Sequence, residues 1–277
     1  MRPTTCFLAM MVLFGMAAFS EDVAPAAEAD GGKDLAKESQ NPLSTMVSLP
    51  FVSGFNFNTG RHNRTQFIEK VQPVYPINLG NWNLINRAII PLINQPIARD
   101  DEEFGLGNIN YTAFLSPAKP GKIIWGFGPS ITMPTNTDDA LGLDEWTAGP
   151  SLVVLTMPGN WVLGALAGNQ WSIAGDDDRG NINAFSLQYF VNYNIPNGNG
   201  WYLKSGPTIT ADWNADSGDR WTIPVGGGIG RVFKIGKQPV DVSLQGLYNV
   251  EKPEDAADWG LEFSFKLLFP RGKKGGK

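Results

Sequence analysis

Residues 259–269 read WGLEFSFKLLF and show most clearly a pattern that recurs along the chain. Apolar side chains stand at every second position from Trp259 to Phe269, and mostly polar residues fill the positions between them. Because successive side chains of a β-strand point to opposite faces, this alternation predicts a strand with one apolar and one polar face. The same period of two recurs in residues 123–133, 161–173, 185–195, 201–213 and 240–250. Six further segments alternate less regularly but are bounded in the same way, namely residues 46–57, 65–76, 82–93, 105–116, 146–157 and 221–234.

The connections between these twelve segments alternate in length and charge. Five are short and neutral or basic, namely residues 78–81, 116–122, 157–160, 196–200 and 235–239. Six are longer and mostly acidic, namely residues 58–64, 94–103, 136–145, 175–181, 214–220 and 251–258. Twelve up-and-down strands need this five-and-six division when both termini lie at the short-turn end. A soluble sandwich has no physical reason to sort its loops, so the alternation favours a membrane-spanning barrel.

The composition of the 277 residues narrows the class of protein. Charged residues make up only 18%, yet the mean hydropathy is −0.16 and no apolar run of about 18 residues exists beyond the extreme N-terminus. A bundle of membrane-spanning helices is therefore excluded. With 9 Trp, 16 Phe and 6 Tyr, the chain can bury far more apolar surface than a disordered protein, so disorder is excluded as well.

Residues 1–20 have the composition of a secretory signal peptide. Arg2 gives the segment a positively charged N-terminal end. A mostly apolar stretch follows it, and small residues come after that stretch. We expect cleavage within residues 20–30, because a second small-residue run ends at Ala29. The sole cysteine, Cys6, would be removed with this segment, leaving no disulfide or thiol. The remaining chain carries 21 basic and 27 acidic residues, so nucleic acid is not expected as a partner.

The mature chain divides into three expected parts. Residues 21–44 form a periplasmic N-terminal segment, in which Asp34 to Gln40 favours a short helix that Pro42 ends. This segment could also plug the barrel from the periplasmic side. Residues 45–270 form the barrel, and residues 271–277 form a basic C-terminal tail.

The nine tryptophans cluster toward the ends of the expected strands. Five lie beside the long loops and the others lie nearer the short turns; in chain order the nine are Trp82, Trp125, Trp146, Trp161, Trp171, Trp201, Trp213, Trp221 and Trp259. Amphipathic indole rings prefer the lipid headgroup level, so we interpret them as two membrane-interface belts. Tryptophan also begins strands in soluble β-proteins, but export and the sorted loops favour a membrane. The expected fold is all-β: a closed, antiparallel, up-and-down transmembrane β-barrel of about twelve strands in the outer membrane of a Gram-negative bacterium.

Closure turns the polar face of each strand into the lining of a lumen. Ten side chains are candidates for this lining: Lys70, Arg87, Asn108, Asn110, Gln188, Lys204, Asp241, Gln245, Glu262 and Lys266. Twelve strands are intermediate between a filled eight-stranded barrel and an open sixteen-stranded pore. We therefore expect a channel for passive passage of small solutes, surrounded by outer-membrane lipid and lipopolysaccharide, with the oligomeric state left open. The alternative is a plugged structural or adhesion barrel that acts through its acidic loops.

No constellation of residues indicates an enzyme, and no cofactor or metal is expected. His62, the single histidine, has no serine near it in sequence, which disfavours a serine–histidine hydrolase. The acidic runs, such as residues 176–178, fit no EF-hand spacing and are expected to be solvated. Residues 226–230, GGGIG, have no helix after them, so we expect bends in the barrel wall instead of a phosphate-binding loop.

Several segments, taken in order, resemble a family of bacterial outer-membrane proteins. They are LAKESQNPLSTMVSLPF (35–51), IIPLINQP (89–96), FGLGNIN and FLSPAKPGKIIWGFGPS (within 104–130), TDDALGLDEWTAGPSLVVLTMPGNW (137–161) and ADSGDRWTIPVGGGIGRVFKIGKQPV (215–240). The chain is similar to β-barrel transporters related to the meta-pathway phenol-degradation outer-membrane proteins, whose members are often mislabelled neuromedin U. The likeness covers residues 35–270 and implies uptake of small solutes such as aromatic or hydrophobic compounds. It supplies no catalytic or binding residues. Outer-membrane barrels commonly end on an aromatic residue, whereas here PRGKKGGK follows Phe269.

Overall fold

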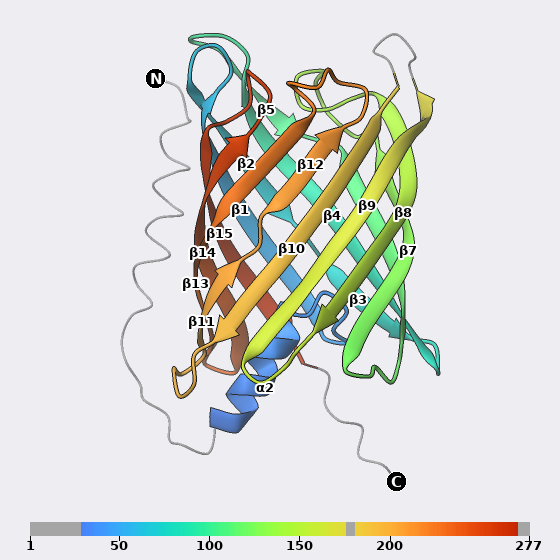
Figure 1. Cartoon of the computed structure of the whole chain (residues 1–277), viewed down its shortest axis with the longest axis vertical. Coiled ribbons are helices and arrows are strands. Elements are labelled where there is room, and N and C mark those ends of the chain that lie inside the picture. The colour runs from blue at the N-terminus through green and yellow to red at the C-terminus, as the bar shows by residue number, and fades with distance from the viewer. Residues whose placement is uncertain (1–28, 176–180, 271–277) are drawn as a thin grey trace.

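The computed structural model describes residues 29–175 and 181–270 (Figure 1). The expected signal peptide and the basic tail lie outside the described residues, as does the centre of the connection at 175–181. One helix and fifteen strand segments occupy these ranges: α2 (Ala29–Gln40), β1 (Val47–Thr59), β2 (Arg64–Val71), β3 (Val74–Asn78), β4 (Trp82–Pro96), β5 (Glu102–Leu106), β6 (Ile109–Pro117), β7 (Ile123–Met133), β8 (Glu145–Thr156), β9 (Trp161–Gly175), β10 (Asn183–Asn194), β11 (Trp201–Ser205), β12 (Thr208–Asp212), β13 (Trp221–Ile235), β14 (Gln238–Glu251) and β15 (Trp259–Phe269).

The fifteen segments form twelve wall strands of one closed antiparallel sheet. Three wall strands are interrupted, because β2 continues as β3, β5 as β6 and β11 as β12 along shared neighbours. The last strand β15 pairs with β1, and β9 pairs with β10, so the ring is closed; β5, near the long-loop rim, pairs only with β4. The closed antiparallel barrel of twelve strands that the sequence predicts is therefore confirmed.

Two of the three interruptions contain a proline. Pro73 separates β2 from β3, and Pro207 separates β11 from β12. Proline has no backbone N–H to donate to a strand ladder, so the pairing stops there and resumes beyond it. Cross-strand register is the same on both sides of the break at Pro207, because Asn192 pairs with Lys204 and Gln188 with Thr208.

The connection between β1 and β2 is shorter than predicted. The sequence places residues 58–64 among the long loops, but β1 extends to Thr59 and β2 begins at Arg64. Asn58 and Asn63 adopt positive φ angles of 60° and 50°, and Gly60 one of 69°. Asparagine and glycine tolerate this left-handed backbone, which allows a tight turn. The prediction of a long loop here was wrong.

Buried apolar residues gather inside the barrel at the end where the short turns lie. They form two clusters: Leu43, Ile85, Phe114, Ile124, Val153, Leu155 and Val162 in one, and Ala36, Met46, Tyr202, Val232 and Leu268 in the other. Both clusters include residues that precede β1. Within the described ranges, no helix has the length and apolar character that crossing a membrane would require.

The glycine run at 226–230 lies inside strand β13, with no helix after it. Gly230 pairs with Tyr202 of β11. A Cβ atom at Gly230 would lie only 2.3 Å from Cζ of the Tyr202 ring. Because Gly230 has no side chain, the Tyr202 ring can lie against the inner wall at this position.

Candidate functional site: the barrel lumen and its inner segment

The inner segment, defined here as residues 35–46, lies inside the barrel at the short-turn end. In Figure 1, the C-terminal half of α2 enters the ring of strands from below. Residues of this segment hydrogen-bond to β10, β14 and β15, and they belong to apolar clusters with residues of β4, β6, β7, β8, β9, β11, β13 and β15. Only a segment within the bore can touch so many strands at once. The helix covers the expected residues 34–40 and begins earlier, at Ala29.

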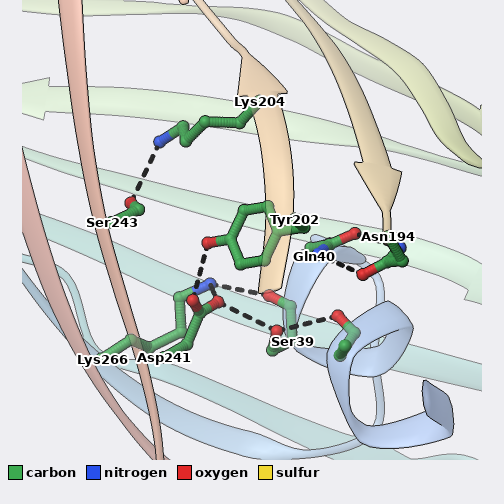
Figure 2. Close-up of polar contacts among 9 residues, drawn as sticks. Ser39, Gln40, Asn194, Tyr202, Lys204, Asp241, Ser243 and Lys266 are labelled. Carbon is green, nitrogen blue, oxygen red and sulfur yellow. Dashed lines mark hydrogen bonds and ion pairs between the residues drawn. The ribbon is translucent and has the colours of Figure 1, made fainter. Parts of the chain in front are cut away.

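Ser39 joins the inner segment to β14 and β15 (Figure 2). Its hydroxyl donates to Asp241 Oδ2 at 2.9 Å, and its carbonyl oxygen accepts from Lys266 Nζ at 2.7 Å. Tyr202 donates its hydroxyl to Asp241 Oδ1 at 2.6 Å, and Lys266 Nζ lies 3.8 Å from Asp241 Oδ2. An ammonium beside the last carbonyls of a helix also complements the negative end of the helix dipole. Hydrogen bonds to charged groups stabilise by about 1.5–3 kcal/mol each, so this cluster is a substantial anchor.

A reciprocal amide pair adds a second polar contact. Gln40 Nε2 donates to Asn194 Oδ1 at 3.0 Å, and Asn194 Nδ2 donates back to Gln40 Oε1 at 3.1 Å. Asn194 also donates to the carbonyl oxygen of Asn160 at 3.2 Å. The end of α2 is thereby tied to β10 as well as to β14 and β15.

Leu43 anchors the opposite side of the inner segment. Its side chain is 4% exposed and packs in the cluster with Ile85, Phe114 and Val162, which come from β4, β6 and β9. Burying a leucine side chain stabilises by about 1.5–3 kcal/mol. The inner segment is therefore held by charged and amide groups on one side and by an apolar contact on the other.

Charged side chains of both signs line one side of the bore between the inner segment and the long loops. Gln245 Nε2 donates to Glu262 Oε1 at 2.8 Å, and Lys204 Nζ donates to Ser243 Oγ at 3.3 Å. Arg87 donates to Gln72 Oε1 at 2.7 Å. Lys70 is on the bore-facing side of β2. It pairs with Val52 of β1, and Val52 pairs with Ser264 on the bore-facing side of β15. Seven of the ten candidate residues thus lie on this side: Lys70, Arg87, Lys204, Gln245 and Glu262, with Asp241 and Lys266 at its lower end. Their role as the lining of a solute path stays a prediction.

Uncharged amides and hydroxyls line the opposite side, on β6 to β9. Asn110 Nδ2 donates to Ser130 Oγ at 3.0 Å, and Gln170 Oε1 accepts from Thr132 at 2.7 Å and also from Thr147. Next to this side, Gln188 of β10 donates to the carbonyl oxygen of Gly206 at 3.4 Å. The bore therefore presents charges of both signs on one wall and mainly neutral hydrogen-bonding groups on the other, with the Glu145 carboxylate near the long-loop end of β8.

Residues 134–144 fold inward at the long-loop end. Leu141 is 4% exposed, and a Cβ atom at Gly105 of β5 would lie 2.8 Å from its Cδ1 atom. Asn108 Nδ2 donates to the carbonyl oxygen of Leu143 at 2.7 Å, and its Oδ1 accepts from the N–H of Asn136 at 3.2 Å. Asn108 therefore holds this loop at the rim of the bore.

Comparison with known proteins identifies the family. Residues 50–265 match the family described as "Putative MetA-pathway of phenol degradation". The chain belongs to this family. Among solved structures, the chain is similar to an outer membrane channel from Pseudomonas putida F1, with a TM-score of 0.63 and 15% identity over 82% of this chain and 97% of that one. The family expected from the sequence is confirmed, and the shared fold is that of an outer-membrane β-barrel.

Two other solved structures are less similar. The CymD monoaromatic hydrocarbon channel gives a TM-score of 0.44 at 10% identity, over 94% of this chain and 97% of that one. Outer membrane phospholipase A from Escherichia coli gives 0.41 at 14% identity, over 81% of this chain and 96% of that one. No curated protein matches the sequence.

The tryptophans of this family member lie at the two ends of the wall. Near the short turns, Trp82 and Trp125 meet edge to face at 5.9 Å, and the Arg231 guanidinium lies 5.4 Å from the Trp201 ring. Trp161 also lies at the short-turn end, directly after the turn at residues 157–160. Near the long loops, Trp213 meets Trp221 at 5.4 Å, and Trp146, Trp171 and Trp259 lie at the same end. Most of them are exposed. Their assignment to two membrane-interface belts stays a prediction.

His62 lies in a polar surface cavity of about 420 Å³ near the β1–β2 turn. Arg61, Arg64 and Asp255 also line this cavity, and no serine is among its lining residues. A serine–histidine pair is therefore not assembled there. Across the parts of the chain that the structure describes, no three His, Cys, Asp or Glu residues gather as a metal site would need.

Sequence reasoning missed the residues that hold the inner segment of this family member. Ser39 and Leu43 carry no chemical motif, although an apolar Leu43 directly after Pro42 is a weak sign of a buried contact. Tyr202 gave a clearer sign, since it is an aromatic residue on the polar face of an alternating strand. Outside this set, on the outer wall, Glu69 also carries a sign in the sequence, because it stands on the apolar face between Phe67 and Val71.

Proposed function

We propose that this chain is an outer-membrane channel for passive passage of small solutes, and that the inner segment closes it in the described state. The observation that carries the proposal is a closed wall of twelve strands whose polar bore contains an anchored N-terminal segment. Lipid offers no hydrogen bonds, so a sheet can span it only by closing on itself. The similar fold of the P. putida outer membrane channel supports the same assignment.

The inner segment is built so that it can leave the bore without disturbing the wall. It precedes β1 and contributes no strand to the sheet. Its polar ties to the wall are concentrated in Ser39 and Gln40, and Leu43 supplies the apolar contact on the other side. A segment that is bound by side-chain contacts and adds no strand to the sheet can leave the bore while the wall stays intact, whereas a purely structural barrel would gain more from a continuously packed interior.

The lining favours small solutes that carry an apolar body and one polar group. Apolar side chains such as Ile85 and Phe114 face the bore on one side of the short-turn end, and Lys266 and Asp241 face it on the other. Passage of small aromatic or hydrophobic compounds fits this lining and the phenol-degradation description of the family. The mixture of acids and bases predicts weak charge selectivity.

Conductance in planar lipid bilayers tests the proposal. The chain starting at residue 21 is compared with a variant that lacks residues 21–43 and with a control that lacks only residues 21–28. We expect small currents from the full chain and the control, and markedly larger currents from the longer deletion. Absence of current from all three would refute the channel and favour the alternative of a plugged structural or adhesion barrel.

A further inference from the structure

Glu69 lies on the outer, lipid-facing side of the barrel wall. It follows Phe67 and precedes Val71 on the apolar face of β2, whereas its neighbour Lys70 faces the bore. In register, Glu69 pairs with Ser53 of β1 and Leu92 of β4, and the Leu92 side chain is exposed on the outside. Among the strand residues that the structure describes, Glu69 is the only acidic one on this face between the two levels of tryptophan.

One of the two carboxyl oxygens of Glu69 has no hydrogen-bond partner. Ser53 Oγ donates to Glu69 Oε2 at 2.5 Å. The Oε1 atom is buried and unpaired, and the whole residue is only 8% exposed. A buried carboxyl oxygen without a hydrogen-bond partner is unfavourable.

Aromatic and aliphatic side chains surround this polar pair. In register, the pair Phe55 and Phe67 flanks it toward the long loops, with ring centroids 5.0 Å apart, and Phe51 and Val71 flank it toward the short turns. Phe263 of β15, which pairs with Ser53, adds an exposed ring. The carboxyl group therefore lies in an apolar setting that can receive the body of an aromatic or aliphatic molecule.

The depth of the site follows from the register. Ser53 pairs with Phe263, which is four residues along β15 from Trp259, and Trp259 stacks on Phe57 at 4.0 Å. Four residues of a tilted strand correspond to about 10 Å along the membrane normal. The site is therefore within the hydrocarbon of the outer leaflet, below the headgroup level, where lipid headgroups do not reach.

A carboxyl group at this depth destabilises the wall unless something pairs with it. Ionisable residues that face hydrocarbon are costly, and a leucine would serve the wall better. Ser53 satisfies one oxygen only. Neighbouring side chains cover the unpaired Oε1 atom, so a hydrogen-bond donor dissolved in the bilayer would reach it by displacing them.

We propose that Glu69 and Ser53 form an outer-wall binding site for the hydroxyl or amino group of an amphiphile dissolved in the outer leaflet, with its apolar body against Phe55, Phe67 and Phe263. A phenol-like solute or a hydroxyl-bearing acyl chain of lipopolysaccharide would supply the same donor. The site is separate from the bore, so its occupancy can be measured whether or not solutes pass through. Only its use in gathering solutes for the channel rests on the proposed function.

Binding of radiolabelled 4-hexylphenol to the protein in phosphatidylcholine nanodiscs tests this site, with empty nanodiscs subtracted. Phosphatidylcholine has no hydrogen-bond donor, and hexylbenzene is the matched probe without the hydroxyl. We expect a saturable component for 4-hexylphenol and none for hexylbenzene. Glu69→Leu should weaken the binding at least tenfold and Ser53→Ala several-fold. Asn86→Leu, which removes another lipid-facing polar group, should leave it unchanged.

Two further measurements keep the outcome decisive. Heat-modifiable migration on gels shows whether each variant is a folded barrel, and Glu69→Leu should unfold at a higher denaturant concentration than the parent. Equal binding of the two probes, or unchanged 4-hexylphenol binding by folded Glu69→Leu, would overturn the proposal. If purified lipopolysaccharide competes with 4-hexylphenol, the occupant is a lipid hydroxyl. If it does not compete, the occupant is a dissolved solute. Neither result depends on conductance, so failure of the channel is a separate finding.

Discussion

Lys266 Nζ lies 2.7 Å from the carbonyl oxygen of Ser39, so the last wall strand is hydrogen-bonded to the end of the helix that enters the bore. The same ammonium lies 3.8 Å from Asp241 Oδ2, which also accepts from the Ser39 hydroxyl. One residue of the inner segment is therefore bound twice by a pair of opposite charges on adjacent strands. This arrangement makes the closure sensitive to single substitutions in the wall.

Replacing Lys266 with Met should loosen the inner segment. The substitution removes the donor to Ser39 and leaves Asp241 without its cationic neighbour, at a cost of about 1.5–3 kcal/mol in docking of the segment. We expect larger and more frequent currents in planar bilayers. Lys122→Met, in an exposed short turn at the same end, is the control and should conduct like the parent. Equal currents from Lys266→Met and the parent would show that this contact does not close the bore.

Replacing Leu43 with Ala should release the other side of the inner segment. Truncation of a buried leucine costs about 2–5 kcal/mol, and Leu43 supplies the apolar contact with Ile85 and Phe114. We expect faster proteolytic cleavage within residues 35–46 of the folded barrel. Leu79→Ala is the matched control, because Leu79 is 55% exposed in a short turn at the same end. Unchanged cleavage of Leu43→Ala would mean that the polar contacts alone hold the segment.

The number and closure of the strands could be predicted because period two is a local property that each segment carries by itself. Trp259 to Phe269 shows it most clearly, and the sorted connections then fix an up-and-down order. The length of the β1–β2 turn could not be predicted, since it depends on the positive φ angles that Asn58 and Asn63 adopt. Asparagine permits such angles without requiring them.

The contacts of the inner segment could not be predicted from the sequence. Ser39 and Asp241 are 202 positions apart, and they meet only because the ring closes with a particular register. No local pattern encodes that register. The face of Glu69, in contrast, could have been predicted, since the alternation that directs Lys70 into the bore directs Glu69 toward lipid.

Replacing Gly105 with Val should displace the inward loop at residues 134–144. A Cβ atom at Gly105 would lie 2.1 Å from Thr137 Oγ1 and 2.8 Å from Leu141 Cδ1, so the loop has to move away from the wall. We expect faster protease cleavage within residues 134–144 and a wider pore in the variant that also lacks residues 21–43. Gly121→Val is the control, because nothing lies within 4 Å of a Cβ atom there. If both variants are cleaved at the parent rate, the loop is held by Asn108 and its neighbours without close packing at Gly105.

Acid should loosen the contact between the β14–β15 loop and the β1–β2 turn. Asn58 donates to Asp258 Oδ2 at 2.8 Å, and Lys252 Nζ lies 3.4 Å from Asp258 Oδ1; first Asn58 and then Lys252 lower the pKa of Asp258 below its ordinary 3.8. A carboxyl group whose pKa is lower in the folded protein stabilises the fold above its ordinary pKa, and this stabilisation is lost as the pH falls through the folded pKa. The Asp258 N–H, which donates to the Phe57 carbonyl oxygen at 3.0 Å, should therefore lose protection, measured as its exchange rate relative to the intrinsic rate at the same pH, below pH 3.8. Hydrogen exchange measured by mass spectrometry checks this, and Asn58→Ala should move the transition to higher pH whereas Glu254→Gln should not. A transition at the same pH in Asn58→Ala would show that the Asn58 amide does not set the protonation of Asp258.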